Sequence, residues 1–129
     1  MTNSKQKGKR GELEIARILK KYGYNCRRSV QYNGRAPEGA ADIVGLPGVH
    51  AEVKRVQSGF SAIQNAMAQA IRDSAGTFET PVVFHRQNRS PWLVTMRLED
   101  WLAMYGAAEV SAAAIDKIIT EGRDAEKEK

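Results

Sequence analysis

Apolar residues recur every three or four positions in four stretches of the chain, the spacing that places side chains on one face of a helix. These stretches predict helices over residues 11–22, 60–75, 99–105 and 110–120. The first is followed by Gly23, a residue type that commonly ends helices. The buried face of the second should consist of Phe60, Ile63, Met67, Ala70 and Ile71.

Five shorter stretches have the alternating or β-rich composition of strands. They cover residues 24–30, 40–46, 50–56, 81–86 and 92–97. Strands that follow one another without an intervening helix pair as hairpins, and here a helix separates the first three strands from the last two. The order therefore predicts an α/β fold in which helices flank a mixed central sheet.

The chain has 129 residues, a length typical of one domain. We expect a flexible basic arm over residues 1–9, one folded domain over residues 10–121, and a frayed charged tail over residues 122–129. No stretch approaches the roughly 18 apolar residues of a membrane span, and the first residues lack the apolar segment of a signal peptide. Because Cys26 is the single cysteine, no intramolecular disulfide can form, and we expect a cytoplasmic protein with no membrane partner.

Positive charge is concentrated at the start of the chain. Residues 1–35 contain ten Lys and Arg against two Glu, whereas residues 36–129 contain ten against thirteen acidic residues. A basic first quarter on a slightly acidic remainder indicates that one end of the molecule binds a polyanion. Nucleic acid is the favoured polyanion, because Arg27, Arg28 and Arg35 lie beyond the expected arm.

Two acidic residues and a lysine on neighbouring predicted strands carry the most informative chemistry. Residues two apart on a strand share a face, so Glu52 and Lys54 should point the same way. Asp42 lies on the preceding strand, and a hairpin can bring it opposite Glu52. Two converging carboxylates form an oxygen site suited to Mg²⁺, for which Mn²⁺ should substitute. With a lysine to orient water or stabilise charge on a phosphate, these groups suit metal-assisted phosphodiester hydrolysis.

A third carboxylate is expected from the first helix, where two candidates lie close together. Glu12 is three, four and seven positions from Ile15, Ala16 and Leu19, so it shares their buried stripe. Glu14 lies about 200° away around the helix, at ~100° per residue. A carboxylate on an apolar stripe needs a partner, and a metal site supplies one. We therefore favour Glu12, with Glu14 as the alternative.

Six positions, taken in order, resemble the motif of the PD-(D/E)XK nuclease superfamily: Lys7, Gly8, Glu12, Asp42, Glu52 and Lys54. Within it, the likeness is to archaeal-type Holliday junction resolvases and their phage relatives. In that group an Arg-Ser pair and a mobile glycine-containing loop follow the first strand, as Arg28-Ser29 and residues 31–39 do here. Ala41 stands where the superfamily motif commonly has proline.

The resemblance covers about residues 5–75 and implies a restriction-endonuclease-like αβββαβ core. It also implies a homodimer that uses a divalent metal to cut DNA in a bacterial or phage-infected cell, and we expect that DNA to be branched. Catalysis would depend on Glu12, Asp42, Glu52 and Lys54, and the three carboxylates would hold the metal. The residues expected to contact DNA are Lys9, Arg10, Arg28, Ser29 and Arg35. Gln69, or alternatively Gln64, matches a glutamine that some members carry on the helix after Glu-x-Lys.

Other interpretations remain open at the level of the sequence. The chain could be a less selective phage DNA nuclease or nickase, or a catalytically inactive DNA-binding module with the same fold. An RNA substrate is a further alternative, because no residue pattern identifies or excludes recognition of the 2′-hydroxyl. His50 and His85 are expected at the surface or behind the metal ligands rather than among them.

Overall fold

The computed structural model describes residues 4–29 and 40–127, which contain three helices and five strands. In chain order these are α1 (Ser4–Lys21), β1 (Arg27–Arg28), β2 (Ile43–Val44), β3 (Val49–Arg55), α2 (Ser61–Ser74), β4 (Thr80–Arg86), β5 (Leu93–Met96) and α3 (Leu98–Lys127). Contacts divide the chain into two compact units, and the boundary along the chain lies between Met96 and Arg97. The first contains the whole sheet with α1 and α2, and the second contains α3.

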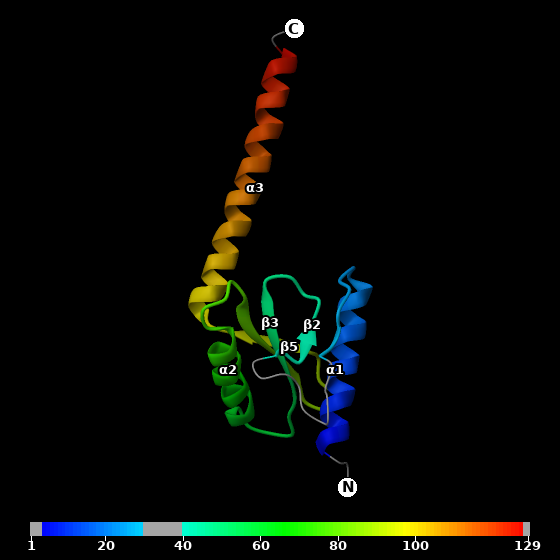
Figure 1. Cartoon of the computed structure of the whole chain (residues 1–129). Helices are drawn as coiled ribbons and strands as arrows, with labels where there is room; N and C mark the ends of the chain where they lie inside the picture. The colour runs from blue at the N-terminus through cyan, green and yellow to red at the C-terminus, as the bar shows by residue number, and fades with distance from the viewer. Residues whose placement is uncertain (1–3, 30–39, 128–129) are drawn as a thin grey trace. The chain divides into compact units, whose positions relative to one another are not determined.

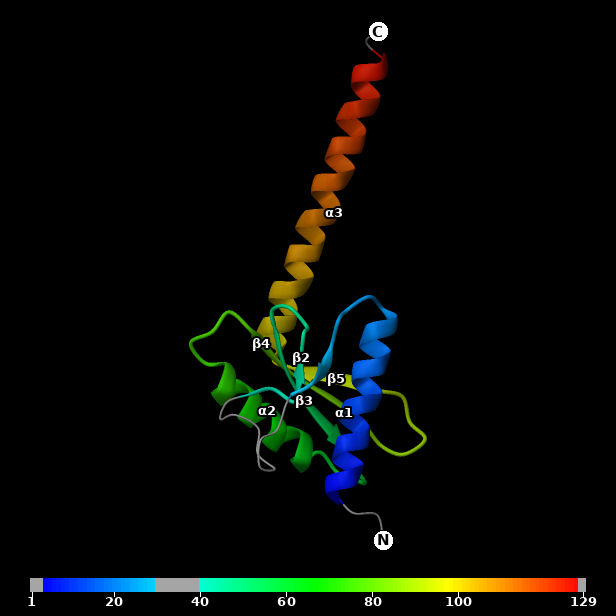
Figure 2. The ribbon, with the colours of Figure 1, turned by 45° about the vertical axis from the view of Figure 1, so that its right-hand side comes forward.

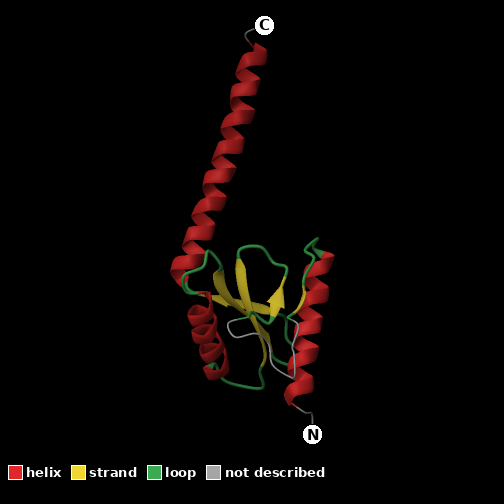
Figure 3. Cartoon of the chain, in the orientation of Figure 1, coloured by secondary structure: helices red, strands yellow, loops and turns green. Residues whose placement is uncertain are grey.

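The strands form one five-stranded sheet in the order in which they occur along the chain. Neighbouring strands are antiparallel except β3 and β4, which are parallel and are joined through α2. A helix is the usual connection between parallel strands, because the chain must return to the same end of the sheet. The predicted α/β fold with a mixed central sheet is therefore confirmed (Figure 3).

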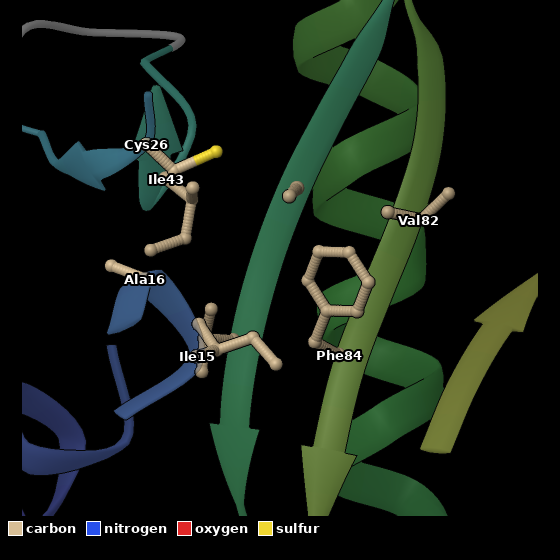
Figure 4. Packing of buried hydrophobic residues seen from close by; sticks show 8 residues of the cluster. Ile15, Ala16, Cys26, Ile43, Val82 and Phe84 are labelled. Carbon is tan, nitrogen blue, oxygen red and sulfur yellow. The ribbon is translucent and has the colours of Figure 1, made fainter. Parts of the chain in front are cut away.

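Alternation along the two central strands sends side chains to both faces of the sheet. Val82 and Phe84 of β4 pack in a cluster with Ile15 of α1, whereas Val83 packs with Ile63 of α2. The helices α1 and α2 therefore cover opposite faces, as the two views of the ribbon show (Figure 1, Figure 2). Figure 4 shows the side chains of the cluster on the α1 side. Burial on both faces explains the continuous apolar run of residues 81–84 in β4.

The N-terminal residues differ from the expectation. Helix α1 begins at Ser4, so residues 4–9 are helical where we expected a flexible arm. Lysine, glutamine and arginine are good helix formers, and a single glycine costs only about 1 kcal/mol relative to alanine. The Gly8 position is also sterically open, because a Cβ there would meet no atom within 4 Å.

The C-terminal part also differs from the expectation. The two predicted helices and the frayed tail are one continuous 30-residue helix, α3. Gly106 and Gly122 lie inside it, and no proline follows Pro91 to interrupt it. By its contacts α3 forms a compact unit of its own, and one domain over residues 10–121 stays a prediction.

Candidate active site

A cavity of about 530 Å³ opens in the sheet-containing unit, and several elements contribute to its wall. Its lining includes Glu12 of α1, Asp42 at the start of β2, Glu52 and Lys54 of β3, and Gln69 of α2. The four residues predicted for catalysis thus line one cavity together with the predicted accessory glutamine. Gln64, the alternative to Gln69, is exposed and does not belong to this lining.

The hairpin of β2 and β3 brings Asp42 to Glu52. Ile43 pairs with Ala51. Because the strands are antiparallel, the residue before Ile43, Asp42, lies opposite the residue after Ala51, Glu52. The Asp42 amide donates a hydrogen bond to the Ala51 carbonyl at 3.0 Å, and Asp42 Oδ2 accepts one from the Val53 amide at 2.9 Å. These bonds tie the carboxylate to the neighbouring strand at the position that the sequence predicts.

Glu52 is the most perturbed group in the cavity. Its side chain is only 4% exposed, and burial, followed by the nearby Asp42 and Asp73 carboxylates, raises its pKa to about 9. Lys54 opposes this rise and lies two residues further along the strand. Burial of neighbouring carboxylates favours the uptake of a proton or a cation, because like charges repel strongly away from water. The neighbouring carboxylates of Asp42 and Glu52 therefore favour the binding of a cation.

The two glutamates of α1 have different surroundings. Glu12 Oε2 accepts a hydrogen bond from Arg28 Nε at 2.7 Å, and the Glu12 side chain is 14% exposed. Burial raises the pKa of Glu12, with the Asp42 carboxylate adding to the effect while the Arg28 hydrogen bond opposes it. Glu12 therefore lies within electrostatic reach of the paired carboxylates.

Glu14 instead joins α1 to side chains of β3 and β4 and to Trp92. It pairs with Arg86 and accepts a hydrogen bond from Trp92 Nε1 at 3.0 Å. One Arg55 nitrogen lies 3.6 Å from its other oxygen. Glu14 does not line the cavity, so its position supports Glu12 over Glu14 as the third carboxylate of the site.

Two further residues meet Glu52 and were not identified from the sequence as metal ligands. His50 Nε2 lies 3.2 Å from Glu52 Oε1, and His50 is 2% exposed. One ligand atom from each of His50, Glu52 and Asp73 lies within 4.8 Å of the others. Both histidines are buried and so are not at the surface, the first of the two positions expected for them: His50 lies against Glu52, and His85 lies 2.8 Å from Thr95 Oγ1.

A signal for both residues was present in the sequence. His50 lies two positions before Glu52, so it shares that face of the strand. Asp73 lies seven positions after Ala66, which returns it to the buried face of α2. The reasoning that selected Glu12, a carboxylate on an apolar stripe, would therefore also have selected Asp73.

The residues expected to contact DNA occupy different surroundings. Lys9 and Arg10 are exposed on α1. Arg28 is hydrogen-bonded to Glu12, and the Ser29 amide donates to the Asp42 carbonyl at 3.0 Å, so both lie beside the cavity residues. Arg35 lies outside the described residues.

The chain was compared with known proteins. The family described as "Phage putative PDDEXK endonuclease" matches residues 3–129. Among solved structures, a similar one is Hjc of Archaeoglobus fulgidus, a Holliday junction resolvase from an archaeal hyperthermophile. It is 25% identical with a TM-score of 0.51, over 69% of this chain and 76% of that chain. No curated protein matches significantly. None of the described helices is long and apolar enough to cross a membrane.

Proposed function

The chain belongs to the phage PDDEXK endonuclease family, and we propose that it cuts DNA in a reaction that depends on a divalent metal ion. The observation that carries the proposal is the convergence of Glu12, Asp42, Glu52 and Lys54 on one cavity. Three carboxylates and a lysine are the groups that metal-assisted phosphodiester hydrolysis requires. This convergence also argues against a catalytically inactive DNA-binding module, which has no need for the complete set.

The donor atoms fit Mg²⁺, and Mn²⁺ should substitute for it. Asp42 and Glu52 supply the carboxylate oxygens that hard divalent cations prefer, and Glu12 is the third candidate ligand. The raised pKa of Glu52 supports this assignment, since a cation can replace the proton that this buried carboxyl otherwise holds. When bound, the ion lowers the pKa of a coordinated water and offsets charge on the phosphate.

The remaining groups have roles that follow from their positions. Lys54 is exposed at the cavity, so its ammonium can orient the attacking water or neutralise charge on a phosphate oxygen. Arg28 holds the Glu12 carboxylate by the hydrogen bond described above and so fixes the direction in which it points. Gln69 can donate a hydrogen bond to water or phosphate from the α2 side of the cavity.

We assign branched DNA, with a four-way junction as the test case, as the preferred substrate. The support is the similarity to Hjc, together with exposed basic residues such as Lys9 and Arg10 near the start of α1. Contacts to phosphates read the backbone and shape of DNA rather than its base sequence. A symmetric junction needs two cuts, so the active form should be a homodimer.

A cleavage panel tests the proposal. With Mg²⁺, the wild-type protein should cut a synthetic four-way junction, and removal of the metal by EDTA should abolish cleavage. Asp42→Ala should lower the rate by about 100-fold or more, because the metal loses a ligand. The matched control is Asp116→Asn, which removes an exposed carboxylate on α3 and should leave the rate unchanged.

The other members of the panel are flap, linear duplex and single-stranded DNA, together with structured RNA. Equal cutting of junction and duplex would contradict the junction preference and favour a less selective phage nuclease or nickase, which the family description also supports. Absence of cleavage of every substrate by folded protein, with either Mg²⁺ or Mn²⁺, would contradict the nuclease assignment itself.

A further inference from the structure

His50, Glu52 and Asp73 form a cluster on the α2 side of the sheet, in which Glu52 is also the neighbour of Asp42. His50 and Glu52 lie two apart on β3 and therefore project to the same face. Asp73 comes from the last turn of α2, the helix that covers that face. The cluster thus joins a strand and a helix that are 21 residues apart in sequence between Glu52 and Asp73.

We propose that this cluster is a second cation site, which takes a first-row transition metal ion such as Mn²⁺ or Zn²⁺. Glu52 would be shared between this ion and the Mg²⁺ of the proposed nuclease site. The inference deepens the proposed function only through that shared residue, because His50 and Asp73 have no part in the nuclease site.

The geometry of the cluster suits one ion. Two ligand atoms at about 2.0–2.2 Å from the same ion lie no more than roughly 4.4 Å apart. The ligand atoms of His50, Glu52 and Asp73 lie within 4.8 Å of one another, so small side-chain rotations are sufficient to bring all three onto one ion. His50 Nε2 is already 3.2 Å from Glu52 Oε1, a separation found between adjacent ligands.

The two negative charges of the cluster also favour the binding of a cation. One carboxylate oxygen of Glu52 and one of Asp73 lie within 4.8 Å of each other. Within residues 4–29 and 40–127, no lysine or arginine forms an ion pair with Asp73. Glu52 is buried, so its repulsion by the neighbouring Asp73 carboxylate is poorly screened, and a divalent ion between the two would offset it.

The donor types distinguish this site from the first one. An imidazole nitrogen is a good ligand for Mn²⁺ and especially Zn²⁺, whereas Mg²⁺ is selected by oxygen ligands. His50 also borders a second cavity of about 260 Å³, whose lining includes Ala41, Val49 and Glu79. His50 thus borders this second cavity, whereas Glu52 lines the catalytic one.

Pulsed electron paramagnetic resonance on the full-length protein with Mn²⁺ alone tests the site, because a coordinated imidazole produces a ¹⁴N coupling. We expect this coupling in the wild type and two bound Mn²⁺ ions per chain by equilibrium dialysis. His50→Gln should lose the coupling, and Asp73→Asn should lose one Mn²⁺ equivalent. Asp42→Asn should retain the coupling, because Asp42 belongs only to the other site.

Glu79→Gln serves as the matched control, since it removes an exposed carboxylate from the lining of the second cavity without removing a ligand. Circular dichroism checks that each variant is folded, and Asp73→Asn carries the test if His50→Gln does not fold. No ¹⁴N coupling in the wild type, or coupling that persists in His50→Gln, would overturn the second site. Junction cleavage with Mg²⁺ in that case would leave the proposed nuclease function intact, and coupling without cleavage would do the reverse.

Discussion

Glu52 combines a buried side chain with three charged neighbours. Its pKa is about 9 in the folded chain without metal and near the ordinary 4.5 in the unfolded chain. The charged groups around it are Lys54 on its own strand, Asp42 on β2 and Asp73 on α2, with His50 as its hydrogen-bonding neighbour. Between the two pKa values the folded state binds more protons than the unfolded state, so the stability of the metal-free protein should fall as pH rises through this window.

Glu52→Gln should remove that dependence. The amide has the shape of the carboxyl group but never ionises, so in EDTA the variant should be more stable than the wild type by about 1–3 kcal/mol near pH 8. Its stability should also change less between pH 5 and about 9. Urea unfolding at several pH values measures both effects, with Asp116→Asn as the control for loss of an exposed acid. A variant with the wild-type pH profile would disprove the electrostatic account of Glu52.

Glu12 and Glu14 provide a second comparison at the residue scale. Glu12→Gln should reduce junction cleavage by about 10-fold or more at nearly unchanged stability, because it weakens a metal ligand. Glu14→Gln should do the opposite and lower the free energy of unfolding by about 1 kcal/mol, because Arg86 and Arg55 lose their anionic partner. Cleavage rates per folded molecule and unfolding midpoints separate the two. If Glu14→Gln were the variant that lost cleavage, the choice of Glu12 would be wrong.

The sequence was informative about residues whose neighbours are close in the chain. Strand alternation and a short hairpin were sufficient to predict that Asp42, Glu52 and Lys54 converge. Asp73 could not be joined to them in the same way, because its approach to Glu52 depends on how α2 crosses the sheet. That crossing is set by packing of the apolar face of α2, which a strand pattern does not contain.

At the scale of elements, the site depends on a close contact between α1, which carries Glu12, and β3, which carries Glu52. Gly11 is buried there, and a Cβ at this position would lie 2.8 Å from Arg55 Cγ. Arg55 cannot move freely, because its guanidinium contacts Glu14 and hydrogen-bonds to Asn88 at 2.6 Å. The absence of a side chain at Gly11 therefore allows α1 to approach the strand that carries Glu52.

Gly11→Ala should accordingly destabilise the protein by about 1–3 kcal/mol, the usual cost of an added group in a filled space. Gly8→Ala, three residues earlier in the same helix, should stabilise it by up to about 1 kcal/mol, because its Cβ meets no atom and alanine favours the helix. Thermal unfolding of the two variants measures the difference. Equal shifts in the same direction would show that helix propensity, and not the approach to Arg55, decides the effect.

Element types were easier to predict than element ends. All five strands and α2 lie where the sequence pattern predicts them, and β3, β4 and α2 bury apolar residues. The ends of α1 and α3 do not follow from it. Their additional residues are polar or exposed, so no apolar period marks them, and good helix formers extend both helices past Gly8 and Gly106.

At the scale of the whole molecule, the division into two units was not predictable from length alone. A chain of 129 residues can form one core, and the domain expected over residues 10–121 included the C-terminal helices. In the structure the core clusters draw on residues from Ile15 to Met96, and α3 forms its own unit. Family membership does not depend on this division, because the family matches residues 3–129, in both units.

The uneven charge along the whole chain leads to a prediction about DNA binding. Affinity for DNA should fall steeply with salt, because each phosphate contact releases a counterion. Replacing both Lys9 and Arg10 by alanine should weaken binding by about 10-fold or more and reduce the salt slope by about 1–2. Binding is measured by fluorescence anisotropy in EDTA, so that no cleavage occurs.

The control removes the same charge elsewhere, by replacing Lys117 and Arg123 of α3 with alanine. Both pairs are exposed, and both variants have the same net charge, so general attraction between protein and DNA changes equally. A larger loss for the Lys9 and Arg10 pair would therefore identify direct phosphate contacts at the start of α1, the helix that carries Glu12. Equal losses for the two pairs would mean that DNA responds to the overall charge, and the proposed contacts on α1 would have to be abandoned.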